Sequence, residues 1–209
     1  MNKMLKQILV IKNNILFNNA ERFNGFSNTT SYEGVILKNY EFMVRGDAEI
    51  NFSYKQPIPY AVIVEEGTNK VFVYKRGGST STVGETRLHD KISFGIGGHI
   101  EPCDENCSDN ILTYSLKREI EEELNLVESD IVSTKLVGFI NDDSNEVGKV
   151  HFGVFYKVYV RNSIVSLNDG ELANGEFLEV NEIEKMVNSG DYDVETWSQI
   201  IFDEIKKIV

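Results

Sequence analysis

The feature that most constrains this chain is an amphipathic helix over residues 109–124, which follows a strand and a glycine-rich loop. Apolar residues recur at positions 112, 116, 120 and 124, so one face of the helix is predicted to be buried. Ser108 or Asp109 is expected to cap its N-terminus. The C-terminal half is crowded with like charges, because four glutamates fall within residues 117–124: Glu119, Glu121, Glu122 and Glu123.

Three of these glutamates are neighbours, since residues three and four apart share a helix face: Glu119, Glu122 and Glu123. Like charges at those spacings destabilise a helix by roughly a few tenths of a kcal/mol per pair. One interpretation is a solvated acidic face, which is typical of charge runs. The other is a divalent cation such as Mg²⁺, which several carboxylate oxygens would coordinate together.

The composition narrows the class of protein. A chain of 209 residues with 41% hydrophobic content suits one domain with an elaboration. The net charge of −12 argues against nucleic acid or an anionic membrane surface as a partner. The N-terminal apolar run, Ile8 to Ile11, is too short for a signal peptide, and we expect a cytoplasmic protein.

Cys103 and Cys107 are the two cysteines of the chain. We expect ordinary reduced thiols, because a zinc site needs more ligands at finger-like spacing. A zinc site that combines them with His99 is the less favoured interpretation.

The region before residue 57 is predicted to be a β-rich extension. Residues 6–17 suggest two strands around a turn at Asn13-Asn14, and weaker strands are predicted near 33–37 and 49–54. "QPIPY" (56–60) marks a domain boundary, because proline resists helix and ladder pairing. We therefore divide the chain into an extension, 1–56, and a main domain, 57–209.

The main domain is predicted to be α/β, with a mixed sheet between helical layers. A hairpin turns at residues 67–69, and a further strand runs into the glycine loop at 91–100. Asp193 is expected to cap a last helix. The remaining predicted elements are strands at 132–140, 149–160 and 175–180 and helices near 182–188 and at 194–208.

The segment "GIGGHIEPCDENCSDNILTYSLKREIEEELNL" (95–126) resembles the Nudix box, the signature of the Nudix hydrolase family. Its first half matches at Gly98, with Gly97 before it and Glu101-Pro102 inside. Its second half matches at Arg118, Glu119, Ile120, Glu122, Glu123 and Leu126.

The segment departs from the family pattern in three places. Asp104 stands where the first box glutamate is expected. The loop before Arg118 carries an insertion, because residues 105–117 fill a space where the family has seven residues. Asn125 replaces the closing glycine, which is a mild change, since asparagine also adopts the left-handed conformation that ends a helix.

The resemblance implies a Nudix-type α/β/α sandwich and a Mg²⁺-dependent pyrophosphohydrolase, with Mn²⁺ as a substitute. Such an enzyme hydrolyses a phosphorus-containing acid anhydride, here in a nucleoside diphosphate linked to another moiety. By family analogy Arg118 would anchor Glu101 or Asp104. The implied metal ligands are Glu119, Glu122, Glu123 and the carbonyl of Gly97, and the implied catalytic residues are Glu119, Glu122 and Arg118.

Residues outside the box are harder to assign. Tyr74 and Arg76 alternate to one side of a predicted strand and, with Arg87, could contact substrate phosphates. Alternation also places Lys149, His151 and Gly153 on one strand face, which is expected to look into the cleft and makes His151 a further candidate for substrate binding. Ordinary structural roles fit these residues equally well. The general base is left open among Asp142, Asp143, Glu146, Glu171 and Glu176.

The alternative function is a non-catalytic Nudix-fold metabolite sensor or interaction module. Such modules usually lose box carboxylates, whereas this chain keeps Glu119, Glu122 and Glu123. An isomerase of isopentenyl diphosphate would need a cysteine that faces a glutamate, but both cysteines lie inside the box loop. We therefore expect an enzyme that acts on a small nucleotide or other diphosphate, without nucleic acid or membrane, and leave a homodimer open.

Overall fold

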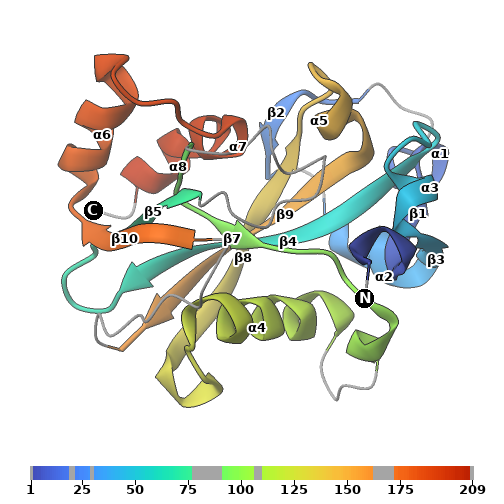
Figure 1. Cartoon of the computed structure of the whole chain (residues 1–209), viewed down its shortest axis with the longest axis horizontal. Coiled ribbons are helices and arrows are strands. Elements are labelled where there is room, and N and C mark those ends of the chain that lie inside the picture. The colour runs from blue at the N-terminus through green and yellow to red at the C-terminus, as the bar shows by residue number, and fades with distance from the viewer. Residues whose placement is uncertain are drawn as a thin grey trace. The chain divides into compact units, whose positions relative to one another are not determined.

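The computed structural model describes residues 2–18, 22–28, 31–76, 91–105, 110–161 and 172–207. The chain forms two compact units, and each is described by itself (Figure 1). Unit 1 comprises Met1–Tyr60, Gly97–Leu116 and Leu136–Phe155. Unit 2 comprises Ala61–Ile96, Lys117–Lys135 and Tyr156–Val209. In the described residues, no helix is long and apolar enough to cross a membrane.

Among the described residues, the strands form a ten-stranded sheet with the path β10-β5-β4-β9-β8-β2. Off this path β1 pairs with β3 and β4, β6 with β5, and β7 with β4. The bounds are β1 Gln7–Lys12, β2 Gly25–Ser27, β3 Glu41–Val44, β4 Tyr54–Glu65, β5 Val71–Arg76, β6 Ile92–Ser93, β7 Ile96–Gly97, β8 Ile131–Asn141, β9 His151–Val160 and β10 Leu172–Leu178.

The longest described helices are α4 and α6, with 14 and 10 residues, and together with the sheet the helices confirm the predicted α/β class. Antiparallel pairs such as β4 with β5 occur beside a parallel bridge between Ile92 and Val194, so the pairing is mixed. The bounds are η1 Lys3–Leu5, α1 Asn13–Leu16, α2 Glu33–Asn39, α3 Arg45–Ala48, η3 Pro102–Glu105, α4 Ile111–Leu124, η4 Glu128–Asp130, α5 Glu146–Val150, α6 Val180–Ser189, α7 Thr196–Ile200 and α8 Phe202–Lys206.

The predicted strands of the extension are partly wrong. The first is confirmed as β1, but the chain then enters α1, where Asn13 Nδ2 donates to the Phe52 carbonyl oxygen at 2.7 Å. Residues 33–37 lie in α2, and Ile36 is the buried residue of that helix. Residues 49–53 are turns and coil, and the strand begins at Tyr54. The proposed boundary at 56–57 falls inside β4.

An aromatic cluster joins the extension to two later strands of unit 1. The Tyr32 ring lies 5.2 Å from that of Phe139 and 5.3 Å from that of Phe152. Phe17 and Phe23 also contact Phe152, at 5.9 and 6.1 Å between ring centroids. Packing of these rings therefore holds Phe17, Phe23 and Tyr32 against β8 and β9.

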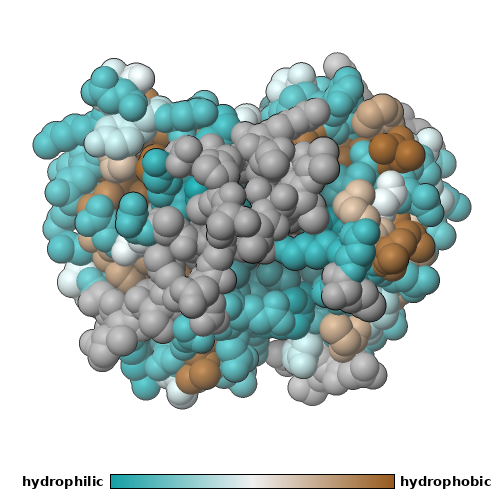
Figure 2. All heavy atoms as spheres, viewed as in Figure 1, coloured by the Kyte–Doolittle hydropathy of each residue, from teal (hydrophilic) through white to brown (hydrophobic). Residues whose placement is uncertain are grey.

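Hydrophobic side chains also reach the surface of the extension. Leu5, Ile50 and Phe52 are exposed. In Figure 2 hydrophobic residues gather on the side where Figure 1 shows α3 and β3.

Unit 2 confirms the hairpin and corrects the last helix. Val64 pairs with Val71, and Asn69 takes the left-handed conformation that the turn requires, with φ 58°. The single helix predicted at 194–208 is wrong, because the chain leaves helical geometry at Ile201 and forms α7 and α8 (Figure 1). Glu195 stands at the N-cap of α7, whereas the predicted cap, Asp193, pairs with Lys91 at 2.8 Å.

Candidate active site and a neighbouring polar cluster

Helix α4 carries the carboxylates of the Nudix box and has the predicted buried face. The side chains at positions 112, 116, 120 and 124 are buried. Asn110 Oδ1 accepts a hydrogen bond from Thr113 N at 2.9 Å and so caps the helix. The predicted caps, Ser108 and Asp109, lie outside the described residues. Asn125 has φ 53°, which confirms the left-handed helix end predicted from the sequence.

Arg118 holds two of the box carboxylates. Its Nη1 lies 2.7 Å from Glu119 Oε1 and 3.2 Å from Glu122 Oε2. The Glu119 side chain is 13% exposed and that of Glu122 is 60% exposed. One guanidinium therefore offsets part of the repulsion on this face and orients both carboxylates. Glu123 is half-buried, and Glu121 is exposed.

Glu123 interacts electrostatically with Tyr74 of β5. Burial raises the pKa of the Tyr74 phenol, and the charges of Glu123 and Glu195 raise it further, against the opposing charge of Arg76. The Tyr74 hydroxyl donates to the Gly95 carbonyl oxygen at 2.9 Å. Arg76 lies 3.7 Å from a Glu195 carboxylate oxygen and 6.0 Å from the Tyr74 ring. The two predicted substrate residues are thus close together and contact protein groups.

The box residues of unit 1 are positioned by close packing. A Cβ on Gly97 would lie 2.3 Å from the Pro59 carbonyl oxygen, so the contact with β4 requires glycine there. The buried Asp104 accepts a hydrogen bond from Glu101 N at 2.9 Å and closes the loop. Glu101 Oε1 pairs with Lys6 Nζ at 2.6 Å, a partner that sequence reasoning missed. The predicted pairing of Arg118 with Glu101 or Asp104 stays a prediction.

A second cluster of polar side chains lies in unit 1. His99 Nε2 lies 2.7 Å from Gln56 Oε1, 3.4 Å from His151 Nε2 and 3.9 Å from Glu49 Oε1. Glu49 also pairs with Arg45 Nε at 3.1 Å. The predicted strand alternation starts only at His151, because Lys149 belongs to α5.

The candidate general bases of unit 1 have structural partners. Asp143 Oδ1 accepts from Lys55 Nζ at 2.7 Å, and Asp142 accepts from Ser144 N and from Asn145 Nδ2, both at 3.0 Å. The candidates Arg87 and Glu171 and the thiol Cys107 lie outside the described residues, whereas Cys103 is exposed as a free thiol.

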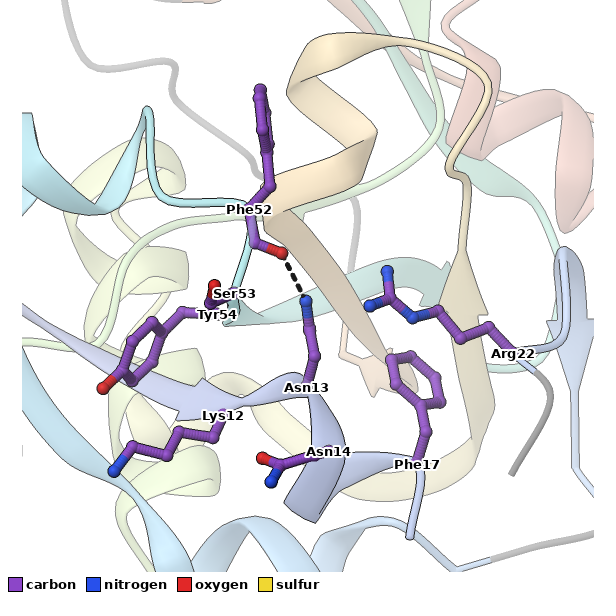
Figure 3. Close-up of a pocket in the computed structure, with 8 residues that line it drawn as sticks. All are labelled: Lys12, Asn13, Asn14, Phe17, Arg22, Phe52, Ser53 and Tyr54. Carbon is purple, nitrogen blue, oxygen red and sulfur yellow. Dashed lines mark hydrogen bonds between the residues drawn. The ribbon is translucent and has the colours of Figure 1, made fainter. Parts of the chain in front are cut away.

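An open pocket of about 640 Å³ in unit 1 was not predicted. Figure 3 shows Lys12 and Arg22 on opposite sides of it, with Asn13 and Asn14 between them. Arg22 packs over the Phe17 ring, 5.4 Å from its centroid. The remaining lining residues are Phe52, Ser53 and Tyr54.

No family model matches the chain, but one protein of known sequence and several solved structures are similar to it. Protein YmaB of Bacillus subtilis (strain 168) is 37% identical over 214 residues, which cover 97% of this chain and 98% of that protein. The crystal structure of Tm1382, proposed to be a Nudix hydrolase, superposes with a TM-score of 0.72 at 23% identity and covers 98% of this chain and 100% of that one.

A second similar structure is a Nudix domain with a ligand. The NUDIX domain of Shewanella oneidensis NrtR, complexed with ADP ribose, has a TM-score of 0.53 at 9% identity and covers 73% of this chain and 87% of that one. The order of elements, the box on α4 and these likenesses define a protein of Nudix fold, which confirms the resemblance seen in the sequence. Within that class the chain belongs to the same family as protein YmaB.

Proposed function

We propose that this protein is a Mg²⁺-dependent Nudix hydrolase that cleaves a pyrophosphate bond in a nucleoside diphosphate linked to another moiety. The observation that supports it is the retained set of carboxylates on α4, Glu119, Glu122 and Glu123, on a Nudix fold. ADP ribose, the ligand in the NrtR structure, is a compound of the proposed substrate class.

The donor set of α4 fits a hard divalent cation. Glu119 and Glu123 are one helical turn apart on the same face of α4, and both side chains are partly buried. Their carboxylates therefore have little freedom to move and can bind the same ion. Glu119, Glu122, Glu123 and the carbonyl of Gly97 would hold Mg²⁺ or Mn²⁺. Such an ion neutralises phosphate charge and lowers the pKa of an attacking water.

The chain's own side chains supply orientation and proton transfer. Arg118 fixes the carboxylates of Glu119 and Glu122 through a shared guanidinium. Glu122 is the most exposed of the three and is suited to orient a water molecule or accept its proton. Arg76, Arg87 and His151 are proposed to contact the substrate, and Tyr74 to support that site through its hydrogen bond to Gly95.

The wider assignment rests on the same proposal. Residues 1–56 would be an extension of a Nudix domain at 57–209. We propose a cytoplasmic protein that acts on a small nucleotide or other diphosphate, without nucleic acid or membrane, and a homodimer fits the exposed apolar side chains of the extension.

The test is a substrate screen with Mg²⁺ and with Mn²⁺. Nucleoside diphosphate sugars, dinucleoside polyphosphates, NADH, ADP-ribose and nucleoside triphosphates are incubated with the protein, and the products are identified. We expect at least one of them to be split at its pyrophosphate, and Glu122→Gln to abolish the cleavage. Ligand-dependent stabilisation against heat without any product, with either metal, would instead identify a metabolite sensor.

A further inference from the structure

We propose that Glu49, His99 and His151 form a second metal site, one that takes a late first-row transition metal such as Zn²⁺. One ligand atom from each residue, two imidazole nitrogens and a carboxylate oxygen, lies within 4.8 Å of the others. The site uses none of the residues proposed to hold Mg²⁺, but it does use His151, which would then bind the second metal rather than the substrate. All three residues belong to unit 1.

The spacing of the ligand atoms matches tetrahedral coordination. Zinc bonds to nitrogen and oxygen are about 2.0–2.2 Å, so two ligand atoms in a tetrahedral site are about 3.4 Å apart. The two histidine Nε2 atoms are 3.4 Å apart, and Glu49 Oε1 is 3.9 Å from His99 Nε2. The third separation, between Glu49 and His151, is at most 4.8 Å, so the Glu49 carboxylate would have to move closer to the two imidazoles to complete the geometry.

The hydrogen bond of His151 to the backbone sets its tautomer. Its Nδ1 lies 2.7 Å from the Val147 carbonyl oxygen, which can only accept, so Nδ1 carries the proton. The lone pair is then on Nε2, the atom that faces His99. Metal-bound histidines typically hold their second nitrogen in this way.

The other two ligands are also held in place. Arg45 Nε, at 3.1 Å from Oε1, orients the Glu49 carboxylate at the end of α3. Gln56 is buried beside His99, and its Oε1, which can only accept, lies 2.7 Å from His99 Nε2. His99 Nε2 therefore carries the proton in the metal-free protein, and the proton has to move to Nδ1 for this nitrogen to bind a metal. The Gln56 Nε2 donor has no hydrogen-bond partner among the described residues, and a water molecule in the open position of the metal site would accept from it.

The chemistry of the ligands selects the class of metal. Two imidazoles and one carboxylate suit Zn²⁺, Co²⁺, Ni²⁺ or Fe²⁺, whereas Mg²⁺ prefers a shell of oxygens. A bound ion would link three parts of the chain: the extension through Glu49, the box segment through His99 and the start of β9 through His151. It would stabilise the folded protein by mass action.

The experiment uses the full-length protein, freed of metal with a chelator and titrated with Zn²⁺ by calorimetry and with Co²⁺ by visible absorption. We expect one tight Zn²⁺ per chain and a Co²⁺ spectrum typical of low coordination number. Glu49→Gln and His151→Ala should each weaken Zn²⁺ binding more than about tenfold. Glu123→Gln is the matched control, since it removes an α4 carboxylate, and should leave Zn²⁺ binding unchanged.

Thermal melting is a second measurement of Zn²⁺ binding that remains usable if a variant is less stable than the wild type. Zn²⁺ should raise the melting temperature of the wild type and of Glu123→Gln but not that of Glu49→Gln. The proposal is overturned if Glu49→Gln binds Zn²⁺ as tightly as the wild type, or if Glu123→Gln abolishes the tight Zn²⁺, which would place the ion on α4. Because Mg²⁺-dependent hydrolysis is a separate readout, failure here leaves the proposed function intact.

Discussion

Lys55 Nζ donates to Asp143 Oδ1 at 2.7 Å from a fully buried position on β4, and also to the Gly148 carbonyl oxygen at 2.7 Å. Burial lowers the pKa of Lys55, although the carboxylate of Asp143 opposes this effect. Burial alone would raise the pKa of Asp143, but the hydrogen bond and charge of Lys55 lower it. The buried ammonium therefore ties β4 to the segment between β8 and β9.

Replacing Asp143 with asparagine should destabilise unit 1 strongly. The change leaves the Lys55 ammonium buried without its counter-charge, and loss of one partner from a fully buried pair costs about 3–5 kcal/mol. Because Asp143 is partly exposed and Gly148 still accepts from Lys55, we expect about 2 kcal/mol, measured by urea denaturation. Asp203→Asn, the same change at an exposed ion pair with Lys206, should leave the midpoint unchanged. Equal effects of the two variants would contradict this account.

The same pair predicts how stability depends on pH. The folded-state pKa of Asp143 is lowered, so its contribution is fully present above the unfolded value of about 3.9 and is lost as the pH falls through the folded value. The difference in unfolding free energy between the wild type and Asp143→Asn should be constant from about pH 5 to 7 and shrink below about pH 4. Denaturation at several pH values measures it, and a difference that grows in acid would refute the prediction.

Gly97→Ala should destabilise the protein even without metal or substrate. Its Cβ would lie 2.3 Å from the Pro59 carbonyl oxygen and 3.2 Å from the Tyr60 Cα, so backbone must move. We expect a loss of about 1–3 kcal/mol in chemical denaturation, as for other overpacked positions. Gly34→Ala in α2 is the control, because its Cβ meets no atom within 4 Å, and it should stabilise by up to about 1 kcal/mol. If Gly97→Ala leaves the free energy of unfolding unchanged, the close packing of Gly97 against β4 does not contribute to stability as proposed.

The extension should be inseparable from the strands that it covers. Phe17 is buried against Phe152, and we expect Phe17→Ala to lower the free energy of unfolding by about 3 kcal/mol. Phe52→Ala, at an exposed ring, should cost less than about 1 kcal/mol. Deleting residues 1–56 removes the rings that cover Phe139 and Phe152 and should cause aggregation in light scattering. A soluble, fully active truncation would show that the extension is dispensable.

Features set by local sequence were predicted well. The buried face of α4 follows from a period that neighbouring residues define, and the left-handed Asn125 follows from the conformational preference of one residue. The apolar run at 33–37 was predicted as a strand because its composition suits either structure. The segment forms α2, in which Ile36 is the buried residue.

Contacts between distant residues could not be predicted from local patterns. Lys55 and Asp143 are 88 residues apart, and His99 and His151 are 52 apart. Each is an ordinary polar residue in its own segment, and only the pairing of strands brings them together. The start of α7 was missed for the same reason, since Glu195 at its N-cap accepts a hydrogen bond from Ser93 of a distant strand.

The carboxylates of α4 should affect stability and activity in opposite directions. Glu123→Gln relieves repulsion with Glu119 in the metal-free protein. The free energy of unfolding without metal should therefore stay the same or rise by roughly a few tenths of a kcal/mol. The same change removes a proposed ligand, so Mg²⁺ should stabilise the fold less. Turnover of a substrate from the screen should fall by about two to four powers of ten, equivalent to about 3–5 kcal/mol.

Glu121→Gln is the matched control for Glu123→Gln, because it makes the same chemical change on the same helix at an exposed side chain that points elsewhere. It should alter turnover by less than about threefold, since surface substitutions away from a site rarely exceed about 0.5 kcal/mol. Melting curves with and without Mg²⁺ and one rate assay complete the comparison. If the two variants are equally active, the acidic cluster is a solvated helix face, and the proposed hydrolase mechanism is wrong.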